Sequence, residues 1–174
     1  MKSIPDWENV KPSADFSALP AGGYVAKIVA VTDNEKKEYL DIVFDIAEGP
    51  EAGRFSDDWG KEHPYAHHFI RSYKNDAKVL GMFKSFTNAV EESNSGYSWT
   101  FKEQTLVGKL IGIVVGYEEY DNDRGERKTR TYVKSLKTVQ QIREGDYTVP
   151  DLKRLPAVDA PEGFTPMSDD ELPF

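Results

Sequence analysis

The order of hydrophobic periods along the chain is the feature that most limits its fold. Residues 38–49 alternate apolar and polar side chains with a period of two, the pattern of a β-strand with one buried face. Apolar, β-branched or aromatic segments precede and follow it at 22–33 and 65–73, and two more lie later, at 109–120 and 128–136. The sequence therefore predicts five strands.

The period changes to that of a helix between the third and the fourth of these segments. After Asn75, a candidate N-cap, apolar residues recur at spacings of four, three and four, which places them on one stripe of a helix: Val79, Phe83, Phe86 and Val90. We expect this helix to end near Glu92, and residues 137–150 to form a short helix or a turn.

Five antiparallel strands with one helix between the third and the fourth have the connectivity of an OB-fold, a partly open Greek-key barrel. Glycines inside the first and fourth strands suit the sharp bends of a small barrel. We expect a mainly β protein with an N-terminal arm at 1–20, one OB-fold domain at 21–148 and a flexible, acidic, proline-rich tail at 149–174. A five-stranded α+β sandwich is the alternative fold.

Composition argues against several kinds of chemistry. The chain has no cysteine, which excludes disulfides and thiolate metal sites and suits a reducing cytoplasm. Three histidines are close in sequence, His63, His67 and His68, but neighbouring strand residues point to opposite faces, so we expect no metal site. No Gly-rich phosphate loop or acid–base pair stands out, so we expect neither an enzyme nor a cofactor. No apolar segment is typical of a secretory signal or a membrane span.

Basic residues concentrate around the fifth predicted strand, although the net charge of the whole chain is −8. If residues 128–136 are extended, Arg130, Tyr132 and Lys134 project from one face of the strand. Such a stripe suits single-stranded nucleic acid, because cations follow the phosphates and an aromatic ring stacks on a base. The alternative is a solvated hairpin whose cations only protect an edge strand.

In the third predicted strand, Phe69, Arg71 and Tyr73 also alternate onto one face, although Phe69 could equally belong to the core. Asp41 and Asp45 on the outer face of the second strand argue against a nucleic-acid site there, because carboxylates repel phosphates. The candidate residues for binding single-stranded DNA are Lys36, Lys37, Phe69, Arg71, Tyr73, Arg124, Arg127, Lys128, Arg130, Tyr132 and Lys134.

Five blocks between about residues 18 and 156 occur in this order: LPAGGYVAKIVAV, LDIVFDIAEG, VEESNSGYSW, LVGKLIGIVVGYEEY and REGDYTVPDLK. In sequence and order they resemble a family of small proteins encoded in the replication or recombination modules of phages of Gram-positive bacteria. Some members of that family are described as single-stranded DNA-binding proteins. The resemblance implies the same activity here, inside a bacterial host.

The last six residues are three acids followed by Leu, Pro and Phe: Asp169, Asp170, Glu171, Leu172, Pro173 and Phe174. They resemble the acidic tip of bacterial single-stranded DNA-binding proteins, and the resemblance implies a peptide that docks onto partner proteins. The physical chemistry agrees, since a terminal aromatic carboxylate fits an apolar pocket rimmed by Arg or Lys, and the acids steer the encounter.

These features predict a protein that coats single-stranded DNA without strong sequence preference during phage DNA replication or recombination. Its tip would recruit replication or recombination enzymes. The alternative is an OB-like protein-interaction adaptor with no significant DNA affinity, which the acidic net charge favours. Either protein could form a homo-oligomer.

Removal of Phe174 is expected to abolish capture of partner proteins and to leave DNA binding intact or slightly stronger, because the residue would be buried only by a partner. A pull-down with the full chain and the truncated chain checks this. Capture of the same partners by the truncated chain would contradict the docking role.

Overall fold

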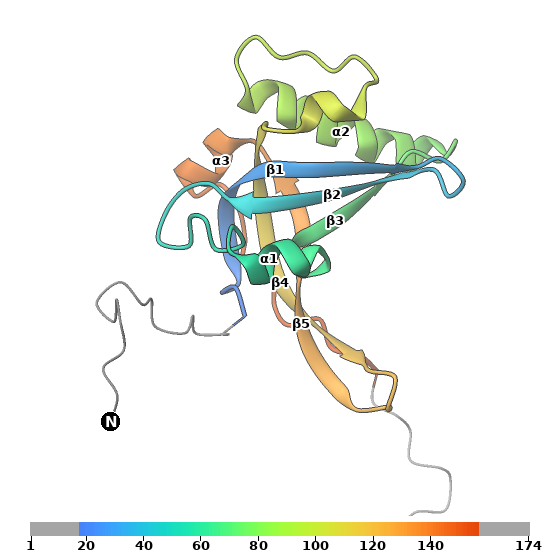
Figure 1. The fold of residues 1–174 in the computed structure, drawn as a ribbon, viewed down its shortest axis with the longest axis vertical. Coiled ribbons are helices and arrows are strands. Elements are labelled where there is room, and N and C mark those ends of the chain that lie inside the picture. Colours follow the sequence, from blue (N-terminus) through green and yellow to red (C-terminus); the bar gives the residue numbers. More distant parts are fainter. Residues whose placement is uncertain (1–17, 157–174) are drawn as a thin grey trace, which may run out of the picture.

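The computed structural model describes residues 18–156 of the 174-residue chain, which form a mainly β protein (Figure 1). Its five strands make one antiparallel sheet in the order β3-β2-β1-β4-β5, with β3 and β5 at the two edges. The strands are β1 (Gly22–Asn34), β2 (Tyr39–Ile46), β3 (His68–Ser72), β4 (Leu110–Asp121) and β5 (Arg127–Lys137). The five predicted strands are thereby confirmed.

Short helices connect the strands within the same residues. They are α1 (Asp58–Glu62), the 3₁₀ helix η2 (Pro64–His67), α2 (Ala77–Ser93), the 3₁₀ helix η3 (Glu103–Leu106) and α3 (Val139–Glu144). The longest, α2, lies between β3 and β4, as its hydrophobic spacing predicts. None of these helices has the length and apolar composition needed to cross a membrane.

β1 pairs with both halves of the sheet. Its second part, Ala26 to Asn34, pairs with β2, and its first part, Gly22 to Lys27, pairs with β4. The register against β2 shifts at Val29, just past the overlap, and such a bulge bends a strand. The sheet therefore curls, and its two edge strands β3 and β5 come into contact across the open side (Figure 1).

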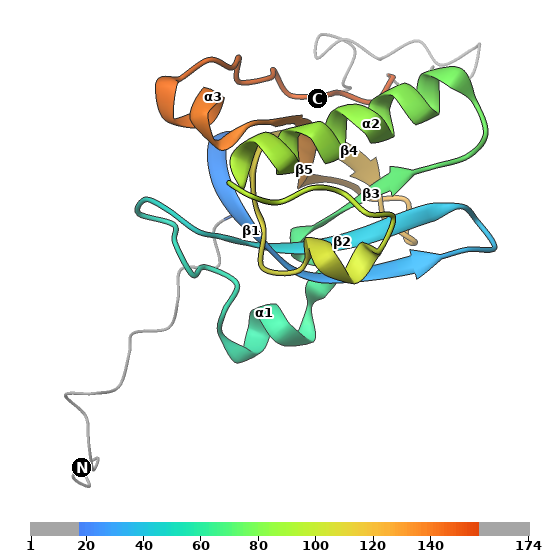
Figure 2. The same cartoon turned by 90° about the horizontal axis from the view of Figure 1, so that it is seen from above.

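The hydrophobic core fills the concave side of the curled sheet. α2 contacts β3, β4 and β5 and covers this side (Figure 2). Phe86 and Val90 of α2 are buried, and Phe83 is partly buried against the same cluster. Phe69 of β3 packs between Phe86 of α2 and Phe44 of β2, and the centroid of its ring lies 6.1 Å from that of each. The core thus joins the helix to the edge strand β3.

Two element boundaries differ from the prediction. The N-cap of α2 is Asp76 rather than Asn75, since the Asp76 carboxylate accepts hydrogen bonds from the N–H groups of Lys78 and Val79. The segment predicted as the third strand begins instead with η2, because Pro64 fixes its own φ and has no N–H to offer a strand partner. β3 consequently starts only at His68.

Glycines on the outer face of β1 and β4 admit the chain that follows β5. A Cβ at Gly23 would lie 2.4 Å from the ring of Tyr147, and one at Gly112 would lie 2.6 Å from the carbonyl oxygen of Thr138. The sequence predicts bends at such glycines, whereas these two positions serve close packing of the segment that contains α3.

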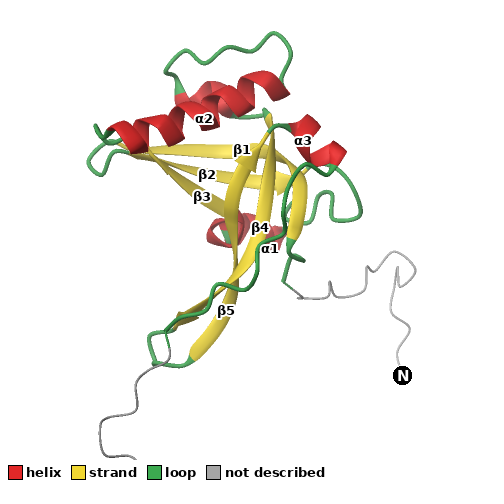
Figure 3. Cartoon of the chain, turned by 180° about the vertical axis from the view of Figure 1, so that it is seen from behind, coloured by secondary structure: helices red, strands yellow, loops and turns green. Residues whose placement is uncertain are grey.

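Residues 150–156, the C-terminal strap, continue along the edge of β4 that β1 leaves open (Figure 3). Lys153 forms a parallel bridge with Glu118 there. Its N–H donates to the carbonyl oxygen of Tyr117, and its carbonyl oxygen accepts from the N–H of Glu119, both at 2.9 Å. The contacts of the body thus extend beyond the domain boundary expected from the sequence.

Gly112→Ala and Gly81→Ala are expected to change stability in opposite directions. The new methyl at position 112 collides with backbone and costs about 1–3 kcal/mol. Position 81 in α2 has no atom within 4 Å of the added methyl, so the helix gains about 0.5–1 kcal/mol. Urea unfolding of both variants measures these changes. Equal effects of the two substitutions would contradict the close approach at Gly112.

Candidate nucleic-acid interface

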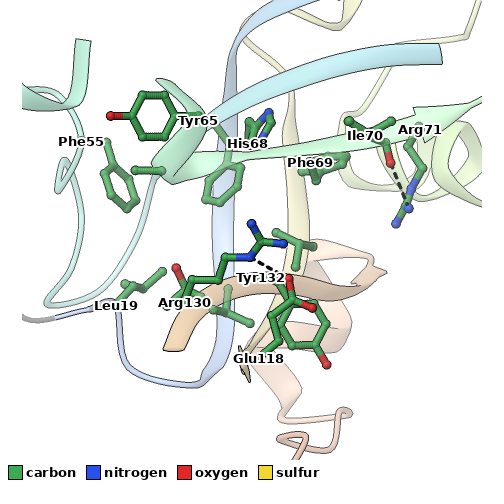
Figure 4. A pocket seen from close by; sticks show the side chains of 15 residues that line it. Leu19, Phe55, Tyr65, His68, Phe69, Ile70, Arg71, Glu118, Arg130 and Tyr132 are labelled. Carbon is green, nitrogen blue, oxygen red and sulfur yellow. Dashed lines mark hydrogen bonds and ion pairs between the residues drawn. The ribbon is translucent and has the colours of Figure 1, made fainter. Parts of the chain in front are cut away.

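The facing edges of β3 and β5 enclose an open hollow, which we name the edge cleft (Figure 4). It brings together four of the residues singled out from the sequence: Phe69 and Arg71 of β3, and Arg130 and Tyr132 of β5. Its volume is about 260 Å³, below the roughly 300–1,000 Å³ of sites that enclose a small molecule. An open hollow of this size suits part of a flexible chain better than an enclosed ligand.

Arg71 is a partly buried cation in the edge cleft. Its guanidinium donates to the carbonyl oxygen of Ile70 at 3.3 Å and lies 5.5 Å from the centre of the Phe69 ring. No carboxylate of residues 18–156 forms an ion pair with it. Burial lowers the pKa of Arg71 below its usual value, which reflects the cost of removing water from an unpaired charge. An anion in the cleft would offset that cost.

Arg130 enters the cleft from the opposite strand, β5, and shares its carboxylate partner with Lys153. Glu118 accepts from Arg130 Nε at 2.9 Å and also lies 3.3 Å from the ammonium of Lys153 in the C-terminal strap. Arg130 lies over the ring of Tyr120, and Lys153 lies over the ring of Tyr132. One carboxylate thus serves two cations, so this group keeps a net positive charge.

The cations at the far end of the β4–β5 hairpin lie outside the edge cleft. Arg127 pairs with Asp121 at 3.2 Å, and Lys128 lies 3.6 Å from Glu126. Arg124 is exposed in the turn, where its backbone N–H donates to the side-chain oxygen of Asn122. These three predicted residues therefore form a separate group, largely neutralised by acids of the same hairpin.

A β-bulge separates Lys134 from the rest of its predicted stripe. Ser135 pairs with Val114 and Val133 pairs with Val115, so Lys134 is the extra residue. The alternation that would place it beside Arg130 and Tyr132 is interrupted at this point. Lys134 lies instead in a groove between β5, β3 and α2, where Arg71 also lies.

The hairpin loop between β1 and β2 forms a third basic area. Lys36 and Lys37 line a hollow together with Lys74, one acid, Glu38, and the exposed side chain of Ile70. Ile70 also lines the edge cleft, so the two hollows meet at β3.

Phe69 and Tyr73 have structural contacts in the chain. Phe69 is only 7% exposed, so its ring belongs mainly to the core, the alternative that the sequence leaves open. The Tyr73 hydroxyl donates to the Asp33 carboxylate at 2.6 Å, and its ring packs edge-on against Phe83. Tyr73 does not line the edge cleft.

The two acids that argue against a nucleic-acid site are held by the fold. The carboxylate of Asp41 lies 2.7 Å from Nδ1 of His68. The carboxylate of Asp45 accepts from the N–H groups of Phe55 at 2.9 Å and of Ile46 at 2.8 Å. Both carboxylates thus have structural roles in the fold, and neither lines the edge cleft.

The three histidines separate into different environments. Both ring nitrogens of the buried His67 face carbonyl oxygens, those of Phe44 and Gly60. His63 stacks on Trp59, and His68 pairs with its aspartate on β2. Residues 18–156 contain no group of three or more possible metal ligands.

Two residues in or beside the cleft escape sequence reasoning. Tyr65 lines the cleft and is 67% exposed, so its ring is accessible. The segment 65–73 is rich in aromatic residues, but the strand predicted there does not indicate which of its rings are exposed and which are buried. Lys153 lies in the stretch assigned to the tail, and nothing in its local sequence indicates pairing with β4. The predicted docking residues 169–174 lie outside the described residues.

Tyr73 is expected to ionise well above an ordinary tyrosine, because its hydrogen bond to Asp33 favours the protonated phenol. This contact raises the pKa of Tyr73 from 10.0 to about 12. The folded-state pKa is the higher one, so the bond stabilises the fold below about pH 10 and this contribution is lost as the pH rises toward 12. Ultraviolet titration of the protein, its Tyr73→Phe variant and its Asp33→Asn variant measures the shift. A difference spectrum that titrates near pH 10 would contradict the bond.

The chain matches no protein-family model and no curated protein. What the edge cleft does is therefore inferred from its own geometry and charge.

Proposed function

We propose that this protein binds single-stranded DNA, without strong sequence preference, in the edge cleft between β3 and β5. The observation that carries the proposal is Arg71, a partly desolvated cation without a carboxylate partner in residues 18–156. A phosphodiester backbone supplies an anion at every nucleotide and so satisfies such a group.

The charges around the cleft support a chain-like anion. Glu118 is shared by Arg130 and Lys153, which leaves a net positive charge on the β5 side. Lys36 and Lys37 line the adjoining hollow on the β3 side. A strand that contacts both hollows would meet cations along its path, whereas a single small anion would meet only one of them.

Base stacking is assigned to the accessible ring at the mouth of the cleft. Tyr65 is 67% exposed and lies among the cleft residues. Stacking on an aromatic ring contributes roughly 1–3 kcal/mol per base and tolerates any sequence. Tyr132 contributes from β5, although Lys153 already lies over its ring. Binding through these contacts would be insensitive to base identity.

We assign the curled sheet to the OB class, in which five strands form a partly open Greek-key barrel. The strand order, the central position of β1 and the contact between β3 and β5 support this assignment. OB-folds bind oligonucleotides or oligosaccharides near the second and third strands and the loops that join strands 1–2 and 4–5. The basic hairpin loop at Lys36 and Lys37 agrees with that location.

The setting we propose is phage DNA replication or recombination in the cytoplasm of a bacterial host. The family-like blocks between about residues 18 and 156 motivate it. The acidic tip at 169–174 would recruit replication or recombination enzymes to the coated strand.

A protein-interaction adaptor without DNA affinity is the second candidate. The ion pairs of the β4–β5 hairpin favour it, because Arg127, Lys128 and Arg130 already have carboxylate partners there. The two functions differ in one simple observable, the affinity for single-stranded DNA at low salt.

Arg71→Ala is expected to weaken binding to a fluorescent oligo(dT) about tenfold, the size of a lost charge-assisted hydrogen bond. The slope of log affinity against log salt should fall by about 0.7, the value for one phosphate contact on a single strand. Anisotropy titrations at several salt concentrations measure both quantities, with a DNA duplex as the competing ligand.

Arg143→Ala is the control, since it removes the same charge, together with the ion pair to Glu48, from α3, which lies outside the edge cleft. It should bind like the wild type. No binding of the wild type to oligo(dT) at low salt would exclude the proposed function and leave the adaptor. Equal losses in the two variants would show that the cleft is not the binding site.

A further inference from the structure

A second groove lies on the other side of Arg71, between α2 and the two edge strands. We name it the α2 groove. Arg71 and Lys134 line it from β3 and β5, and Met82 and Ser85 line it from α2. Since Arg71 lines both hollows, the edge cleft and the α2 groove meet at this residue.

The bulge in β5 directs the second cation to this groove. Lys134 is the unpaired extra residue between Val133 and Ser135, and its side chain is exposed. In a regular strand without a bulge, alternation would place Lys134 on the same face as Tyr132. Bulges commonly re-aim a side chain beside a binding site. Two strands thus each contribute one cation to the same groove.

The rest of the groove suits a nucleotide. No acidic residue is among the described residues that line it, and none of those residues forms an ion pair with Arg71 or Lys134. Met82 is 54% exposed, which leaves an apolar, flexible surface on the helix. Ser85 is exposed, and its hydroxyl donates to the carbonyl oxygen of Gly81 one turn earlier.

We propose that single-stranded DNA passes from the edge cleft over Arg71 into the α2 groove, where Lys134 binds a further phosphate and Met82 contacts a sugar or base. This inference rests on the proposed function and extends it to a surface of α2 outside the apolar stripe predicted from the sequence. Its consequence is a longer binding path, so an oligonucleotide that fills both hollows should bind more tightly than one confined to the edge cleft.

Charge changes at Ser85 test the path, because the position is exposed and tolerates a longer side chain. Ser85→Glu should weaken binding of a long fluorescent oligo(dT) by about three- to tenfold, and Ser85→Lys should strengthen it and raise the salt slope by about 0.7. Asn88→Glu and Asn88→Lys are the matched controls. Asn88 is exposed on the same helix and lines neither hollow.

The outcomes separate this inference from the proposed function. Opposite effects of Glu and Lys at position 85, with little change at position 88, support the path and cannot arise from misfolding. Wild-type binding with equal effects at positions 85 and 88 overturns the path and leaves the edge cleft as the site. Absence of wild-type binding at low salt overturns both.

Discussion

The division of β1 between two partners is the constraint on which the rest of the structure depends. β1 pairs with β4 through its first half and with β2 through its second half. The bulge near Val29, just past the overlap of the two pairings, bends the sheet there. The bend brings together two strands that are the edges of the sheet, β3 and β5. Edge strands carry unpaired backbone groups, so the same geometry that encloses the core also creates an open, polar-rimmed cleft.

The chain after β5 determines which surfaces stay available. It packs on the glycine-bearing outer face of β1 and β4, and the C-terminal strap then occupies the free edge of β4. Lys153 arrives in this way beside Glu118, which would otherwise pair with Arg130 alone. The outer face is therefore covered by the chain itself, while residues 18–156 leave open the cleft between β3 and β5 and the groove along α2.

Local patterns predict the elements well, and tertiary contacts decide the site. The alternation at 38–49 and the helical stripe through Phe86 are burial patterns, which a sequence displays directly. Arg71 and Arg130 stand out as cations in strands. Only the fold reveals that Arg71 has no carboxylate partner within residues 18–156 and that Arg130 shares Glu118. The bulge at Lys134 leaves no local signal, since its cause is the register between β4 and β5.

Mapping the surface that oligo(dT) contacts tests the central claim most directly. In amide chemical-shift titrations of the full chain, oligo(dT) should change the signals along the edge of β3, around Tyr65 and Lys134, and along the first half of α2. The covered outer face beneath α3 should remain unchanged. Changes centred on α3, or none at a DNA excess in low salt, would contradict a nucleic-acid site between β3 and β5.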